Sequence, residues 1–161
     1  MSDQPSTVAL SSQPTIPNTN PIEDFGHGVT RQWLYDQRIV VFTRPTASQA
    51  AVDAWFIAVH KTYTEWPPDR PFLGLHDYSG QYAYTPYSKA RISELAALPK
   101  KGYEVYSAVV LPRTFTRSLV VLIMYGMEAI KRTDLHQRIF FEKEAALLWL
   151  KTILDKPTMF G

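Results

Sequence analysis

The fold is decided by the stretch RIFFEKEAALLWL, residues 138–150. Its first four residues, 138–141, are apolar and aromatic after one arginine and predict a short strand. Residues 142–155 predict a helix, because their apolar side chains recur at helical spacing on one face. Those side chains are Ala145, Leu148, Trp149 and Ile153. A strand that runs directly into an amphipathic helix is the repeating unit of an α/β domain.

The same alternation continues toward the N-terminus. Strands are predicted at residues 33–35, 39–42, 71–76 and 106–111, and helices at residues 47–66, 85–97 and 116–132. Pro67-Pro68 ends the first of these helices, and Thr85 with Pro86 begins the second in the manner of a capped helix. The order β-β-α-β-α-β-α-β-α therefore predicts an α/β domain with a mixed, mostly parallel sheet covered by helices.

The chain of 161 residues is long enough for one domain. Fifteen of its first 22 residues are Ser, Thr, Pro, Gln or Asn, a composition that buries too little apolar surface to fold. We expect a disordered or extended N-terminal arm over residues 1–24, a folded domain over residues 25–157 and a short tail over residues 158–161.

Composition excludes several classes of function. The absence of cysteine excludes disulfides and thiolate chemistry. The four histidines have no metal-ligand spacing and the seven glycines form no phosphate-binding loop, so no metal and no cofactor are expected. The longest apolar run, residues 119–127, is far shorter than the roughly 20 residues of a membrane span. With no signal at the N-terminus, a cytoplasmic protein is expected.

The closing stretch resembles a known family. Arg138, Phe140, Ala146, Trp149 and Leu150 match the strand-to-helix pattern R-x-F-x-x-x-x-x-A-x-x-W-L of STAS-like domains, in the SpoIIAA-like branch of the anti-sigma factor antagonists. The predicted strand at residues 106–111 and the stretch at residues 73–79, a strand ending in an acidic turn, are similar to that branch as well. The resemblance covers roughly residues 30–155 and implies a single STAS-like domain.

The resemblance also implies a phosphorylatable serine. The family carries it in an Asp-Ser-Ser-Gly loop after a central strand, and the matching stretch here is Asp77-Tyr78-Ser79-Gly80. Ser79 is then the candidate phosphoacceptor. The sequence departs from the family where Tyr78 replaces the first serine and where four residues precede the next helix.

Two features indicate binding surfaces. Six tyrosines lie within residues 78–106, and tyrosine is enriched where proteins meet partners. Among them we predict partner binding for Tyr82, Tyr84 and Tyr87. The predicted helix at 116–132 is apolar around most of its circumference, so it is either buried in the domain or in contact with a partner. Its candidate contact residues are Leu119, Leu122, Ile123 and Tyr125.

Catalysis has the least support. His76, Asp77 and Ser79 offer a base, an acid and a hydroxyl, but neighbouring strand residues point to opposite faces and form no relay. We therefore expect a protein that is not an enzyme.

The predicted function is a regulatory protein-interaction module, as a homo-oligomer or as a subunit of a larger assembly. A carrier of an apolar small molecule or lipid, with the apolar helix lining its pocket, is the first alternative. A phospho-regulated switch at Ser79 is the second. The basic residues near the tyrosines form no dense patch, so nucleic acid is not an expected partner.

Overall fold

A mixed six-stranded sheet organises the part of the chain that the computed structural model describes, residues 20–99, 103–114 and 134–156. The strands lie side by side in chain order, β1-β2-β3-β4-β5-β6. β1, β2 and β3 pair antiparallel, and β3 to β6 pair parallel. The strands are β1 Glu23–Asp24, β2 Thr30–Leu34, β3 Ile39–Thr43, β4 Phe72–Asp77, β5 Val105–Val110 and β6 Leu135–Phe140. The predicted α/β class with a mixed, mostly parallel sheet is confirmed.

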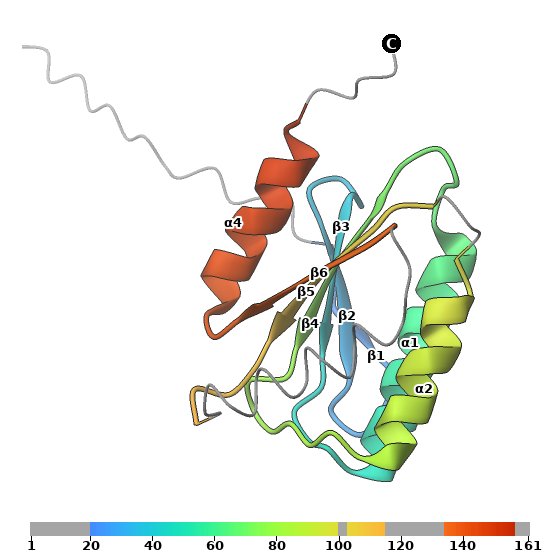
Figure 1. Cartoon of the computed structure of the whole chain (residues 1–161), viewed down its shortest axis with the longest axis vertical. Coiled ribbons are helices and arrows are strands. Elements are labelled where there is room, and N and C mark those ends of the chain that lie inside the picture. Colours follow the sequence, from blue (N-terminus) through green and yellow to red (C-terminus); the bar gives the residue numbers. More distant parts are fainter. Residues whose placement is uncertain (1–19, 100–102, 115–133, 157–161) are drawn as a thin grey trace, which may run out of the picture.

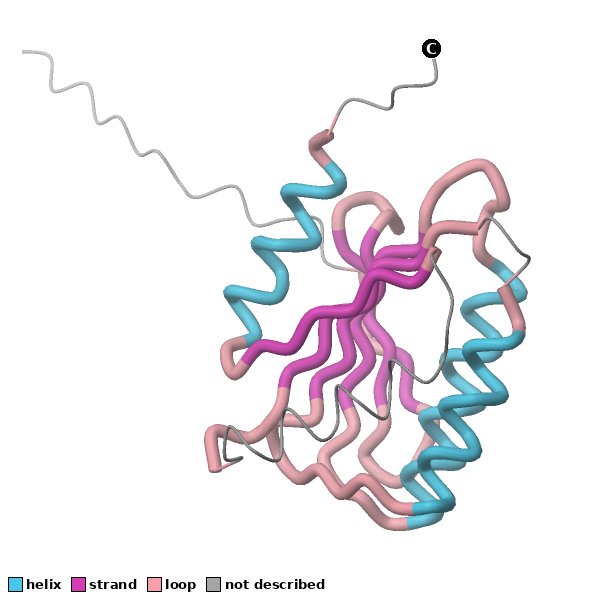
Figure 2. Tube along the Cα trace, in the orientation of Figure 1, coloured by secondary structure: helices cyan, strands magenta, loops and turns pink. Residues whose placement is uncertain are grey.

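Helices cover both faces of this sheet. α1 (Gln49–Glu65) follows β3 and α2 (Pro86–Ala97) follows β4, and the two pack side by side on one face (Figure 1). α4 (Lys143–Leu154) follows β6 and lies on the opposite face, against β4, β5 and β6 (Figure 2). The described elements thus form three layers.

Local signals in the sequence set the ends of these helices. The side chain of Ser48 accepts a hydrogen bond from the backbone N–H of Ala51 and caps α1. Thr85 and Ser88 form a reciprocal capping box at α2, with Pro86 at its first position. Both α1 and α2 fall within the predicted ranges, because capping and proline rules act over a few neighbouring residues.

β4 is the centre of the domain, since all six of its residues are buried. Its side chains alternate between the two faces. Leu73 and Leu75 pack into the cluster under α4, with Ala146 and Leu150 of that helix. Phe72 and Tyr78 join the cluster under α1 and α2. One strand therefore supplies the apolar side chains of both cores.

The predicted boundary between arm and domain, at residues 24 and 25, coincides with the end of the first strand. Glu23 and Asp24 form β1 and pair with Arg31 and Thr30 of β2, so the sheet begins inside the segment expected to be an arm. The reason is a charge contact that composition does not show. Arg31 is 3% exposed, and its guanidinium donates to Glu23, Thr62 and Glu65 at 2.7–3.2 Å. The rest of the predicted arm, residues 1–19, lies outside the described residues.

The predicted helix at 116–132 also lies outside the described residues, as does the C-terminal tail at 158–161. The same holds for Leu119, Leu122, Ile123 and Tyr125, so partner binding by these residues stays a prediction. Among the helices that the structure describes, none has the length and apolar character that crossing a membrane requires.

Replacing Arg31 with Met should lower the free energy of unfolding by about 2 kcal/mol, because the buried guanidinium loses its hydrogen bonds to two carboxylates and to Thr62. Urea unfolding at pH 7 measures the change. The matched control is Arg38→Met, since Arg38 is exposed and its replacement should change stability by less than about 0.5 kcal/mol. Equal losses in the two variants would show that the Arg31 network does not hold β1 to the sheet.

The ion pair between Glu23 and Arg31 makes the stability of the fold depend on pH. The hydrogen bonds and charge of Arg31 lower the pKa of Glu23 below its usual 4.5. A carboxyl with a lowered pKa stabilises the fold above its unfolded pKa, and this contribution is lost as the pH falls below about 4.5.

Candidate functional site

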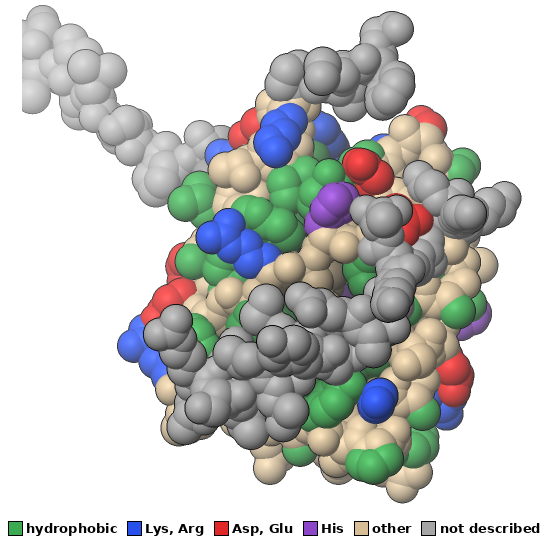
Figure 3. Space-filling view, viewed as in Figure 1, with side chains coloured by type: hydrophobic (Ala, Val, Ile, Leu, Met, Phe, Trp, Pro, Cys, Tyr) green, Lys and Arg blue, Asp and Glu red, His purple; other side chains and the backbone are tan. Residues whose placement is uncertain are grey.

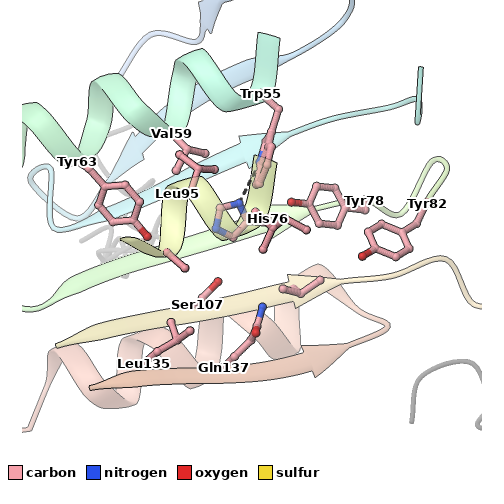
Figure 4. A pocket seen from close by; sticks show the side chains of 13 residues that line it. Trp55, Val59, Tyr63, His76, Tyr78, Tyr82, Leu95, Ser107, Leu135 and Gln137 are labelled. Carbon is pink, nitrogen blue, oxygen red and sulfur yellow. Dashed lines mark hydrogen bonds between the residues drawn. The ribbon is translucent and has the colours of Figure 1, made fainter. Parts of the chain in front are cut away.

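A pocket lies between the helices α1 and α2 and the face of β4, β5 and β6 (Figure 4). It encloses about 70 Å³. Most of its wall is apolar, with a few polar side chains among them. The described residues that line it are Trp55, Val59, Tyr63, His76, Tyr78, Tyr82, Ile92, Leu95, Ala96, Ser107, Val109, Leu135 and Gln137.

His76 of β4 stands in the middle of this wall, between Trp55 and the strand residues (Figure 4). The indole Nε1–H of Trp55 donates to His76 Nδ1 at 3.1 Å. Since Nδ1 accepts, the neutral ring carries its proton on Nε2. Complete burial and, secondarily, the charge of Arg44 lower the pKa of His76 to about 3. His76 is therefore a neutral hydrogen-bond donor through Nε2 at physiological pH.

Aromatic rings fix the position of this imidazole. Phe42 stacks on it with ring centroids 5.2 Å apart, and Trp55 meets it edge-on at 5.5 Å. Tyr78, two residues along the same face, lies 6.1 Å away and stacks in turn on Tyr82 at 5.2 Å. Such contacts leave the ring little freedom to turn, so the tautomer set by Trp55 is held by packing as well.

The two tyrosines keep their protons. Burial raises the pKa of Tyr82 to about 12 and raises the pKa of Tyr78 further above its usual value of 10. Both phenols are therefore neutral and able to donate a hydrogen bond at neutral pH.

Two polar side chains come from the neighbouring strands. Ser107 of β5 and Gln137 of β6 are direct partners in the parallel pairing, so both project to the same face of the sheet and into the pocket wall (Figure 4). No Asp or Glu is among the described lining residues. The arrangement suits holding a small molecule with an apolar body by one polar group, which is the usual chemistry of ligand pockets.

The predicted tyrosines take part in this packing. Tyr82 is 8% exposed and lines the pocket, and Tyr84 packs half-buried against the same core. The hydroxyl of Tyr87 donates to Asp53 of α1 and lies 3.4 Å from an Arg91 nitrogen. The three side chains therefore form no continuous exposed stripe, and partner binding through them stays a prediction.

Ser79, in the turn after β4, lies outside the pocket that His76 lines. The carboxylate of Asp77 accepts the backbone N–H of Ser79 at 3.0 Å and forms the predicted turn. Ser79 is exposed and borders a crevice of about 550 Å³ at the carboxyl ends of β4, β5 and β6. Arg113 and Glu142, which pair with each other, line the same crevice. An accessible hydroxyl is what a phosphoacceptor needs, and phosphorylation of Ser79 stays a prediction.

The separation of His76 from Asp77 and Ser79 agrees with the strand argument. His76 lines the pocket under α1 and α2, whereas Asp77 and Ser79 line the crevice. These three residues thus form no relay. The part of the chain that the structure describes also holds no group of three or more His, Cys, Asp or Glu side chains arranged to bind a metal.

Figure 3 shows hydrophobic side chains gathered around α4 on one surface of the molecule. Leu148 of α4 is 64% exposed and Phe141, just before that helix, is 40% exposed. Single exposed apolar side chains are ordinary on protein surfaces.

Sequence reasoning missed most of the pocket. Ser107 lies in the strand predicted at residues 106–111, and its polarity was the signal that could have marked a lined cavity. Gln137 lies in β6 but precedes the strand predicted at residues 138–141, because that prediction began at Arg138. Trp55 lies in the helix predicted at residues 47–66, and its buried indole N–H needs an acceptor. That acceptor, His76, is 21 residues away in the sequence.

Comparison of the chain with protein-family models, with curated proteins and with solved structures found no match. The resemblance to STAS-like domains therefore stays a prediction.

Replacing His76 with Phe should flatten the pH dependence of stability between pH 7 and 5. The unfolded chain takes up a proton at His76 near pH 6.5, whereas the folded protein does so near 3. The unfolded state therefore binds more protons in between, and the wild-type free energy of unfolding falls as the pH is lowered through this range. Urea unfolding at pH 7, 6 and 5 measures the slope.

The control for this experiment is His60→Phe, because His60 is exposed on α1. That variant should keep the wild-type slope, while His76→Phe should not. A wild-type slope in both variants would mean that His76 titrates as an ordinary histidine and that its contact with Trp55 does not hold it neutral.

Proposed function

We propose that this protein binds a small molecule with an apolar body and one polar group in the pocket beneath α1 and α2. This is the carrier role that the sequence left open as an alternative, with the pocket walled by described side chains of α1, α2, β4, β5 and β6. The observation that carries the proposal is the polar centre of an apolar cavity: His76 in the wall, fixed as a donor by Trp55.

An unfilled pocket supports a binding role, because side chains normally fill the interior of a protein. Voids larger than a water molecule are few in a close-packed domain. This one has its polar groups on one side of an otherwise apolar wall, from three adjacent strands. Apolar contacts give the affinity in such a site, and the polar groups give orientation and selectivity.

The volume limits the size of the bound molecule. A cavity of about 150 Å³ holds the six carbon atoms of benzene, so about 70 Å³ encloses about three non-hydrogen atoms. The pocket is partly open, so a molecule of about five such atoms can extend beyond the enclosed volume. A short-chain acid, amide or alcohol fits this volume, whereas the full chain of a lipid does not.

The protein-interaction role has no comparable support among the described residues. Its tyrosines are packed into the fold, and its helix residues lie outside the described part of the chain. Native mass spectrometry separates the roles, because added mass from a bound small molecule supports a carrier and a multiple of 18.4 kDa supports self-assembly.

Propionamide, a neutral probe of five non-hydrogen atoms, should bind saturably to the full chain. Titration followed by the indole N–H resonance of Trp55 in NMR measures the affinity, because this group lies in the pocket wall and donates to His76. Ser107→Leu should weaken binding at least about tenfold, since the added carbons occupy the cavity.

The matched control is Ser93→Leu, because Ser93 is exposed on α2. It introduces the same side chain away from the pocket and should keep the wild-type affinity. Propionamide affinity that Ser107→Leu leaves unchanged would place binding elsewhere and overturn the proposed function.

A further inference from the structure

Arg44, directly after β3, is a buried cation with an unusual environment. It is 1% exposed, and its Nε and Nη2 atoms find no hydrogen-bond partner among the described residues. Its guanidinium carbon lies 4.3 Å from the ring centre of Tyr78, 5.5 Å from that of Trp55 and 5.9 Å from that of Tyr82. No acidic side chain of the described residues forms an ion pair with it.

Arg31, the other buried arginine among the described residues, has carboxylate partners as well as aromatic ones. Arg31 also lies over two aromatic rings, but Glu23 and Glu65 balance its charge and Thr62 accepts one of its N–H groups. Arg44 has the rings without the carboxylates. A buried charge is costly unless it is paired, and aromatic faces recover only part of that cost. Within the part of the chain that the structure describes, the charge of Arg44 is therefore balanced by aromatic rings alone and by no carboxylate.

This charge lies next to the pocket. The three rings that surround the guanidinium, those of Trp55, Tyr78 and Tyr82, are themselves in the pocket wall. Tyr78 and Tyr82 lie together at one end of the pocket, and Tyr63 and Leu135 lie toward the other (Figure 4). The positive potential of Arg44 is therefore strongest at the Tyr78–Tyr82 end.

The polar groups of the pocket point to the same ligand chemistry. His76 can only donate, because its Nδ1 is occupied by Trp55 and its ring is neutral. The phenol of Tyr78 also carries a proton to donate, and no lining residue that the structure describes is acidic. A group that accepts several hydrogen bonds and carries negative charge is complementary to this end of the pocket.

We propose that the pocket selects a small carboxylate: its anionic group lies at the Tyr78–Tyr82 end in the field of Arg44, and its apolar tail extends toward Val59, Leu95 and Leu135. The inference rests on the proposed function and names its ligand class. The carboxylate supplies the counter-charge that no described residue gives to Arg44. Binding of the carboxylate thus also compensates the charge of Arg44.

The test compares two probes of the same size and shape. Propionate and propionamide differ in charge at one end and share the same ethyl group. Each is titrated into the full chain at pH 7 and constant ionic strength, with the Trp55 indole resonance as the readout. Propionate should bind about tenfold to a hundredfold more tightly, the range expected for one charge-assisted contact in a buried site.

Arg44→Met should abolish this preference while leaving propionamide binding intact, because the variant keeps an apolar side chain against the three rings and removes only the charge. Arg38→Met is the control, since it removes an equal charge from the surface and should keep the preference. Arg44→Lys retains the charge and should favour propionate as the wild type does. If the Met variant fails to fold, the Lys variant still tests whether a positive charge at residue 44 is enough for this preference.

Stability gives an independent readout. In the absence of ligand, Arg44→Met should unfold at an equal or higher urea concentration than the wild type, because it removes a buried charge without a carboxylate partner. A clear loss of stability in Arg44→Met, together with an unchanged preference for propionate, would show that Arg44 has only a structural role.

The failures of the two proposals are distinguishable. If propionamide binds and propionate binds no more tightly, the pocket binds small molecules and the selection of carboxylates is wrong. If neither probe binds in the pocket, the proposed function is wrong and the carboxylate inference is wrong with it.

Discussion

The complete burial of β4 is the constraint on which the rest of this structure depends. Helices cover the strand on both sides, and its neighbours β3 and β5 pair with it in parallel, which is typical of sheets buried on both faces. Leu73 and Leu75 satisfy the α4 face with close apolar packing. The opposite face carries Gly74 and His76 between Phe72 and Tyr78, so the strand brings a small residue and a polar residue under α1 and α2. The ring of Phe72 fills the space over Gly74, and His76 lines the pocket.

The two buried arginines on the sheet face under α1 and α2 differ in their charge partners. At β2, Arg31 is neutralised by Glu23 and Glu65, and the contact holds the first strand to the sheet. At the end of β3, Arg44 stacks among aromatic rings with no carboxylate from the described residues. The charge of Arg31 is therefore paired with carboxylates, whereas Arg44 has only aromatic rings as charge partners among the described residues. The proposed carboxylate ligand would supply the charge partner that the described residues do not give to Arg44.

The parts of the fold that were predictable from the sequence depend on residues close together in the chain. The caps at Ser48 and Thr85 and the proline stop after α1 depend on a few adjacent residues, so composition and spacing locate them. The alternation of strands and helices then implies the α/β class. β1 escaped prediction because two residues carry no periodicity, and their place depends on Arg31, eight residues from Glu23. For the site, the sequence drew attention to the tyrosines around residue 82 but assigned them to an exposed surface.

The sequence by itself determined where the described strands and helices other than β1 lie to within a few residues. It also determined that His76 and Asp77 face opposite ways, because period-two and period-3.6 patterns are local properties of the backbone. Only the tertiary structure decided that Trp55 meets His76, that Ser107 lies beside Gln137, and that Arg44 is enclosed by rings from α1 and the loop after β4. Those contacts join residues tens of positions apart. The burial that lowers the pKa of His76 and leaves Arg44 unpaired exists only once the helices have closed over the sheet.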